Sequence, residues 1–100
     1  MTIYQKPLTI SEIVIKNILS INAEVSTTEE LSSGTPLILN STNKWEKATD
    51  LNVVDAKRVG ILLDTANEDG IYMILLIGKI ANIELSEKIK VALFNANIVF

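Results

Sequence analysis

The sequence predicts a small, mainly β domain with one short helix near its C-terminus. The chain has 100 residues, the length of a single domain. Hydrophobic residues make up 48% of it and aromatic residues only 5%, so the apolar content is largely aliphatic and rich in strand-favouring isoleucine. Residues 71–77, read as a strand, are apolar on both faces. Such a strand must be covered on both sides, which a small chain achieves by closing a barrel or by presenting one face to another subunit.

The first quarter of the chain divides into a polar arm and an ambiguous apolar segment. Residues 1–9 read as an extended arm. Residues 10–25 fit both a two-residue and a helical period, and Thr9 and Glu12 have the spacing of a helix capping box. A strand is favoured over a helix because β-branched residues dominate the segment, most firmly over residues 18–26.

The middle of the chain reads as short strands separated by polar connections. A polar stretch with room for one helical turn at residues 28–32 leads into residues 37–48, which read as a hairpin-like pair of strands. Within this pair, Trp45 is either a packing anchor of the core, which we favour, or part of an interface. The next strand, expected over residues 58–64, contains Gly60, and a glycine inside a strand marks a bulge or a close backbone approach.

The final third of the chain completes the sheet and supplies the helix. Residues 65–70 have the Asp-Gly chemistry of a hairpin turn, and the doubly apolar strand follows over residues 71–80. A short helix is expected over residues 84–94, with Ser86 as its N-cap. The chain ends on apolar residues, so we expect its carboxyl end to dock as a strand. The predicted buried stripe of the helix comprises Leu85, Ile89, Ala92 and Leu93.

Composition argues against several classes of function. The net charge is −3 and the basic residues are scattered, whereas nucleic-acid binders carry a clustered basic footprint. The longest apolar run is far shorter than the roughly 18–20 residues of a transmembrane helix, and the amino-terminal sequence lacks the order of a signal peptide. We therefore expect neither nucleic acid nor a membrane as a partner. The lack of cysteine is consistent with a reducing cytoplasm.

Residues suited to catalysis or metal binding are few. The sequence has no histidine and no cysteine, which removes the usual nucleophile–base pairs and thiolate metal sites. Glu68 and Asp69 are adjacent carboxylates that we interpret as solvated turn charges, since they lack the ligand pattern of a calcium loop. Asp64 follows an apolar strand, where a turn-capping aspartate fits as well as a catalytic acid. The sequence thus predicts no catalytic residues, no cofactor and no metal site.

Three landmarks within residues 34–100 resemble a known family. They are the Gly-Thr-Pro-Leu entry into a strand at 34–39, the Val-Gly-Ile-Leu strand at 59–62, and a short helix running into the ending Ala-Leu-Phe-x-Ala-x-Ile-Val at 92–99. In this order and spacing they resemble the lambda-type bacteriophage head decoration proteins. The resemblance implies a small β-barrel or β-tulip-like domain that assembles as a homotrimer on the outer capsid surface, stabilises the shell and is not an enzyme.

The resemblance also implies a location, partners and contact residues. The protein would be made in the host cytoplasm and reside on the virion, with copies of itself and the major capsid protein as partners. Residues 1–20 would be an N-terminal arm or strand segment, and residues 21–100 a single β-rich domain. Strand addition by the arm would supply main-chain hydrogen bonds, and trimerisation would supply avidity. The expected capsid-binding residues are Ile3, Tyr4, Pro7, Leu8 and Ile10, and the expected trimer-interface residues are Tyr72, Ile74, Leu76, Ile98 and Phe100.

Two other classes of function stay open at this point. One is a different small-barrel oligomerisation module, belonging to a phage tail or a cellular assembly. The other is a small ligand-binding or enzymatic barrel that uses Asp64, Tyr72 or Glu84. Assembly is favoured over catalysis because the doubly apolar strand and the apolar carboxyl end demand more covering surface than a lone small domain is expected to offer.

Overall fold

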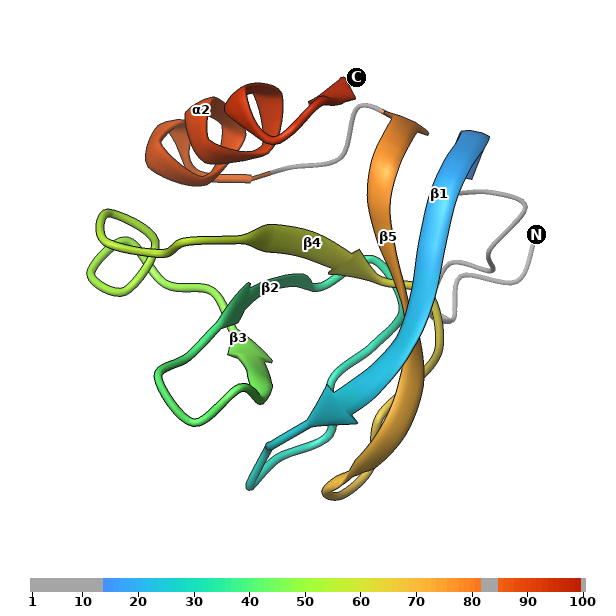
Figure 1. The fold of residues 1–100 in the computed structure, drawn as a ribbon, viewed down its shortest axis with the longest axis vertical. Helices are drawn as coiled ribbons and strands as arrows, with labels where there is room; N and C mark the ends of the chain where they lie inside the picture. Colours follow the sequence, from blue (N-terminus) through green and yellow to red (C-terminus); the bar gives the residue numbers. More distant parts are fainter. Residues whose placement is uncertain (1–13, 82–84, 100) are drawn as a thin grey trace, which may run out of the picture.

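Six strands and one short helix make up the described part of the chain, residues 14–81 and 85–99 of a computed structural model (Figure 1). This arrangement confirms the prediction of a mainly β fold with one short helix near the C-terminus. The strands are β1 (Val14–Val25), β2 (Pro36–Leu39), β3 (Trp45–Lys47), β4 (Val59–Leu62), β5 (Gly70–Ile80) and β6 (Ile98–Val99), and the helix is α2 (Glu87–Asn95).

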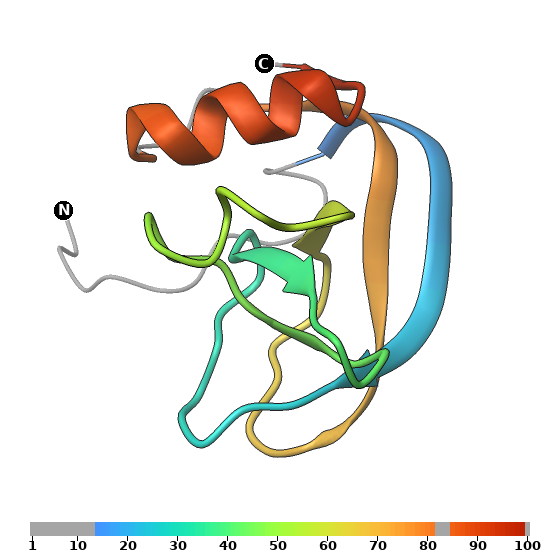
Figure 2. The ribbon, with the colours of Figure 1, turned by 60° about the vertical axis from the view of Figure 1, so that its left-hand side comes forward.

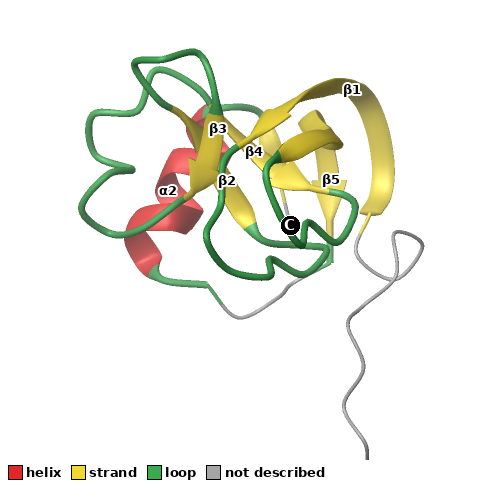
Figure 3. Cartoon of the chain, turned by 90° about the horizontal axis from the view of Figure 1, so that it is seen from below, coloured by secondary structure: helices red, strands yellow, loops and turns green. Residues whose placement is uncertain are grey.

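The pairing of the strands follows a closed circuit. The order in the sheet is β1-β3-β2-β4-β5-β6, and β1 also pairs with β5. These two strands are antiparallel and run side by side as a long curved pair, which ends where Val25 lies opposite Gly70 (Figures 1 and 3). Val25 also pairs in parallel with Trp45 of β3, and this contact closes the circuit through β1, β3, β2, β4 and β5. β6 lies outside the circuit, parallel to β5.

Two hydrophobic clusters lie on the two faces of this sheet. We call the first the inner cluster, because each of the five strands in the circuit contributes a fully or largely buried residue to it. The outer cluster lies between the sheet and α2, which Figure 2 shows lying across one end of the strands. The inner cluster consists of Val25, Leu31, Leu37, Trp45, Leu62, Ala66 and Ile74; the outer cluster consists of Ile38, Ala48, Val53, Val59, Ile61, Leu63, Leu75, Ile80, Ile89, Leu93 and Ile98.

β1 settles the ambiguous N-terminal segment in favour of a strand. It begins within the described residues at Val14 and continues without interruption to Val25, so it crosses the boundary that we expected after residue 20. The strand prediction over residues 18–25 is confirmed. The segment forms a strand because β5 pairs with it along its length and because its β-branched isoleucines favour a strand. The predicted arm at residues 1–9 lies outside the described residues.

The predicted helical turn at residues 28–32 is wrong. Leu31 instead forms an isolated antiparallel bridge with Ala66, in which each backbone N–H donates to the other's carbonyl oxygen at 2.8 Å. An extended conformation lets Leu31 reach the inner cluster and satisfies its backbone at the same time. The burial of Leu31 and its pairing with the distant Ala66 therefore outweigh the local tendency of residues 28–32 to form a helical turn.

The predicted pair of strands at residues 37–48 is confirmed. β2 and β3 are antiparallel, with Leu39 opposite Trp45. The Trp45 side chain is only 3% exposed and belongs to the inner cluster, so the interpretation of this residue as a core anchor is confirmed.

α2 and β6 confirm the predictions for the carboxyl end. The Ser86 hydroxyl accepts a hydrogen bond from the backbone N–H of Ile89 at 3.3 Å, which makes it the N-cap of α2. Ile89 and Leu93 point into the outer cluster, and Leu85 and Ala92 pack against it, as the predicted stripe requires. Among the described residues no helix is long and apolar enough to cross a membrane.

Gly60 lies where β4, β5 and the indole of Trp45 come closest together. A Cβ atom at this position would lie 2.6 Å from Cγ2 of Ile74, 2.9 Å from the carbonyl oxygen of Leu75 and 3.3 Å from Cζ3 of Trp45. Two of these distances are too short for any real contact, and one of them is to backbone, which cannot rotate away. The predicted close approach at Gly60 is thus confirmed.

We expect the substitution Gly60→Ala to lower the free energy of unfolding by about 1–3 kcal/mol, because the added methyl group overpacks the inner cluster. Urea unfolding followed by the fluorescence of Trp45 measures the change. Gly70→Ala is the matched control. The three atoms nearest to a Cβ at that position all belong to the side chain of Tyr72 and lie at 3.2–3.4 Å. Equal destabilisation by both substitutions would contradict this assignment of the close approach.

Candidate functional site

The carboxylates that the sequence offers as catalytic candidates hold loops together. Oδ2 of Asp64 accepts a hydrogen bond from the backbone N–H of Met73 at 3.2 Å, which is the turn-capping role. Oδ1 of Asp69 accepts a hydrogen bond from the backbone N–H of Thr27 at 2.8 Å and so ties the loop before β5 to the segment after β1. Both contacts stabilise the chain's own backbone.

The other candidates for chemistry are not brought together. The hydroxyl of Tyr72 donates to the carbonyl oxygen of Glu68 at 2.9 Å. Glu84 lies outside the described residues. Over residues 14–81 and 85–99, no group of three or more carboxylates could hold a metal ion. The absence of catalytic function stays a prediction, and the geometry here offers no constellation on which a reaction could be built.

The residues expected at a trimer interface occupy different environments. Ile74 and Ile98 are fully buried within the single chain and therefore have no surface to offer another subunit in this conformation. Tyr72 and Leu76 are half-buried and pack against the inner cluster. The remaining members of the predicted sites, Phe100 at the interface and Ile3, Tyr4, Pro7, Leu8 and Ile10 on the capsid-binding arm, lie outside the described residues.

One exposed apolar surface lies on β1. Ile15 and Ile18 are each 62% exposed, and Leu19, also exposed, lies opposite the half-buried Ile77 of β5. The edge of β1 that faces away from β5 pairs, among the described strands, only at Val25. This surface, which we call the β1 patch, therefore combines apolar side chains with a strand edge that has room for another strand.

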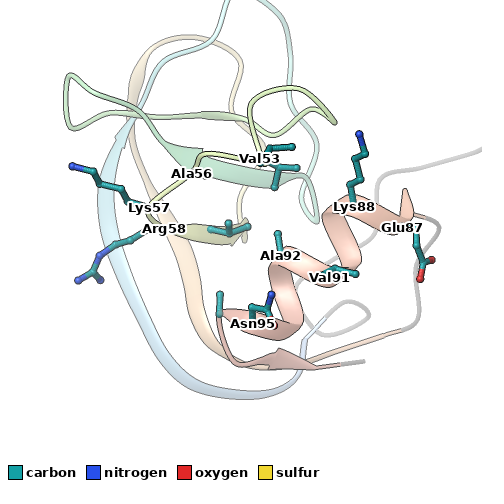
Figure 4. Close-up of a pocket in the computed structure, with 12 residues that line it drawn as sticks. Val53, Ala56, Lys57, Arg58, Glu87, Lys88, Val91, Ala92 and Asn95 are labelled. Atoms are coloured by element: carbon teal, nitrogen blue, oxygen red, sulfur yellow. The ribbon is translucent and has the colours of Figure 1, made fainter.

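A groove separates α2 from the loop between β3 and β4, residues 48–58 (Figure 4). Its volume is about 520 Å³. Val53 and Val59 are buried at its base, whereas Val54 and Val91 stand on its two sides and are 67% and 53% exposed. The groove is thus apolar within, and it is open to solvent.

Hydrogen bonds hold the loop at a fixed distance from the helix. A carboxylate oxygen of Asp50 lies 2.5 Å from the hydroxyl of Ser86, the residue that caps α2. The side-chain amide of Asn52 accepts a hydrogen bond from the backbone N–H of Thr49 at 2.7 Å and donates one to the carbonyl of Lys47 at 2.9 Å. These contacts fold the loop back on itself and fasten it to the helix, so the groove is formed before anything binds.

Positive charge gathers at the rim of the groove. Lys57 and Arg58 extend from the loop side and Lys88 from α2, all directed away from the base in Figure 4, and Glu87 is the one acidic side chain of the lining. None of these three cations forms an ion pair with a described residue. A local excess of positive charge on a chain of net charge −3 is unlike the scattered pattern expected from the sequence.

Neither the β1 patch nor the groove beside α2 was predicted as a surface from the sequence, although the sequence of α2 contains an indication of the groove. Val91 and Phe94 are apolar residues on α2 that fall outside its buried stripe, and both are exposed. An apolar residue on the polar side of an amphipathic helix indicates a second contact surface. The β1 patch gave no comparable signal, because its exposure depends on which strands pair with β1.

We expect Ser86→Ala to lower the free energy of unfolding by about 1 kcal/mol, because it removes both the N-cap of α2 and the partner of Asp50. Thermal unfolding measures the change. Ser86→Asn is the matched control, since asparagine caps helices as well as serine does and should stay close to the parent protein. An asparagine variant as unstable as the alanine variant would argue against the capping role.

Comparison with known proteins adds no family to this description. The chain matches no protein-family model, and neither the curated proteins nor the solved structures contain a match to it. Inference about function therefore rests on the residues and on the geometry of the two surfaces.

Proposed function

We propose that the protein is a structural head decoration protein, which binds the outer surface of a bacteriophage capsid as a homotrimer and stabilises the shell without catalysis. The observation that carries the proposal is the β1 patch. Its exposed residues Ile15, Ile18 and Leu19 lie within residues 1–20, the arm or strand segment of the sequence resemblance, on the C-terminal side of the five residues expected to bind the capsid. The apolar residues of that segment and of the patch would thus form one continuous contact region along the chain.

Burial of the β1 patch would supply free energy for attachment. Removing an isoleucine side chain from water contributes about 1.5–3 kcal/mol when burial is complete, and Ile15 and Ile18 are each 62% exposed. The free edge of β1 offers main-chain donors and acceptors to an added strand at the same place. Three copies acting together would turn a modest contact per copy into firm attachment.

The proposal includes a small barrel and a particular trimer contact. In this proposal the barrel would be formed by the closed circuit of five strands, and the buried residues of the inner cluster, to which each of these strands contributes, support it. Because Ile74 and Ile98 are internal, the trimer contact would use the partly exposed residues of β5 instead, namely Tyr72 and Leu76, together with Ile71, which is 70% exposed. A ring of three identical subunits requires a head-to-tail contact that closes on itself.

Deletion of residues 1–12 should leave a folded trimer that no longer binds shells. Light scattering at micromolar concentration gives the oligomeric state, and co-sedimentation with shells of the major capsid protein encoded in the same genome gives binding. A monomeric parent protein would overturn the trimer. Loss of folding on deletion would instead place these residues in the core, and unchanged shell binding would overturn their role in attachment.

Ile18→Asp should weaken shell binding by roughly tenfold or more, because it places a charge where the proposal buries an apolar side chain. Leu51→Asp is the matched control, since Leu51 is an exposed apolar residue in the loop before β4, away from the β1 patch. Circular dichroism checks that both variants fold. Equal loss of binding in the two variants, or none in Ile18→Asp, would contradict the assignment of the β1 patch to the shell.

A further inference from the structure

The groove beside α2 continues into a second hollow. The second hollow, of about 310 Å³, shares Lys57, Arg58, Val59 and Ala96 with the groove and extends to the apolar side chains of Leu19, Leu76 and Ile77. The two hollows adjoin at these four shared residues, so that together they lead from α2 to the β1–β5 pair. We call the two hollows together the α2 track.

We propose that the α2 track binds a peptide segment of a partner protein that carries apolar side chains and at least one carboxylate. The inference goes beyond the proposed function, because it names a different partner and the first twelve residues take no part in it; the track meets the proposed shell and trimer contacts only at Leu19 and Leu76. Two properties of the track select this occupant, namely its apolar base and the sign of the charge along its rim.

The apolar base and the open shape favour a peptide over a small metabolite. Small-molecule sites hold their ligand by a few precisely placed polar groups inside a largely enclosed pocket. Here the buried side chains among the described residues are all apolar, and the track is open along its length. A peptide with apolar side chains can lie along such a depression and place successive side chains on Val53, Val59 and Leu76.

The charge of the rim selects an acidic segment. Lys57 and Arg58 stand on one side of the groove and Lys88 on the other, so a carboxylate lying in the track would have a cation within reach on either side. None of the three has a described acidic partner to compete for it. On a protein with an overall charge of −3, this local reversal of sign steers an acidic segment to the track and disfavours its approach elsewhere.

The track is also pre-organised for binding. Val53 anchors the loop in the outer cluster, and the contact between Asp50 and Ser86 fixes the loop to the helix cap. A preformed surface loses less conformational entropy when it binds than a mobile loop does. The partner segment would therefore bear most of the ordering cost.

Selection from a library of random 12-residue peptides on the intact, folded protein tests the inference. The expected result is enrichment of peptides that combine aspartate or glutamate with leucine, isoleucine, valine or phenylalanine. A synthetic copy of an enriched peptide should shift the backbone NMR signals of Lys57, Arg58, Val59 and Val91. Its affinity should fall as salt is added, because exposed charges at the rim are screened.

Matched pairs of variants test whether the charges and apolar side chains of the track itself, rather than the net charge of the protein, determine peptide affinity. Lys57→Glu combined with Arg58→Glu should weaken the peptide by roughly tenfold or more, whereas Lys16→Glu with Lys79→Glu makes the same change in net charge outside the track and should not. Val54→Asp should likewise weaken binding, and Leu51→Asp should not, because Leu51 is exposed but does not line the track. A peptide whose acidic residues are replaced by their amides should bind more weakly than the parent peptide, and the charge reversal at Lys57 and Arg58 should weaken it little further.

Several outcomes would overturn the inference. They are failure to enrich any peptide, enrichment of peptides without acidic residues, and NMR shifts that map outside the track. Self-association that Lys57→Glu with Arg58→Glu abolishes would show that a second copy of the chain occupies the track instead. Deletion of residues 1–12 should leave peptide affinity unchanged, so failure of this inference and failure of shell binding are distinguishable; a large gain in affinity on deletion would assign the track to the chain's own N-terminal segment.

Discussion

The double burial of β5 is the constraint on which the rest of the fold depends. Ile74 and Leu75 are adjacent in this strand and both fully buried, yet they point to opposite faces of the sheet. One face needs an enclosed interior, which the closed circuit of strands supplies. The other face needs a second layer, which α2 and β6 supply. The narrow contact at Gly60 follows from the same constraint, because β4 must lie close against β5 for both clusters to be dry.

Because one chain covers both faces at the centre of β5, most of the apolar surface left for partners lies elsewhere. Apolar strand sequence alone suggested that β5 itself would face another subunit, whereas its central residues and Ile98 are internal. The exposed apolar side chains instead gather on β1 and beside α2. Among the described strands, β1 pairs along its length with β5 alone, on one edge, and its pairing with β3 at Val25 closes the circuit. The exposed apolar side chains that favour assembly thus lie mainly on β1, at the edge of the sheet, rather than at the buried centre of β5.

The groove beside α2 shows how a loop without regular secondary structure is held in a fixed position. Residues 48–58 have little secondary structure of their own, and side-chain hydrogen bonds from Asn52 and Asp50 replace a regular backbone ladder. Val53 buries the middle of the loop in the outer cluster, and Lys57 and Arg58 at the C-terminal end of the loop are directed to solvent. Their positive charge lies over an apolar base, a combination that neither element has by itself.

The sequence by itself determined the local elements: the strands, the capped helix at Ser86, the close approach at Gly60 and the docked carboxyl end. The strands and the helix depend on residues near one another in the chain, through β-branching and capping chemistry. The other two were indicated by a single local feature each, the lack of a Cβ atom at Gly60 and the apolar ending of the chain. The tertiary structure decided what covers β5, the bridge from Leu31 to Ala66 that replaced a helical turn, and both exposed surfaces. Those features depend on which distant segments meet, and a strand's exposure is a property of its neighbours in the sheet rather than of its own residues.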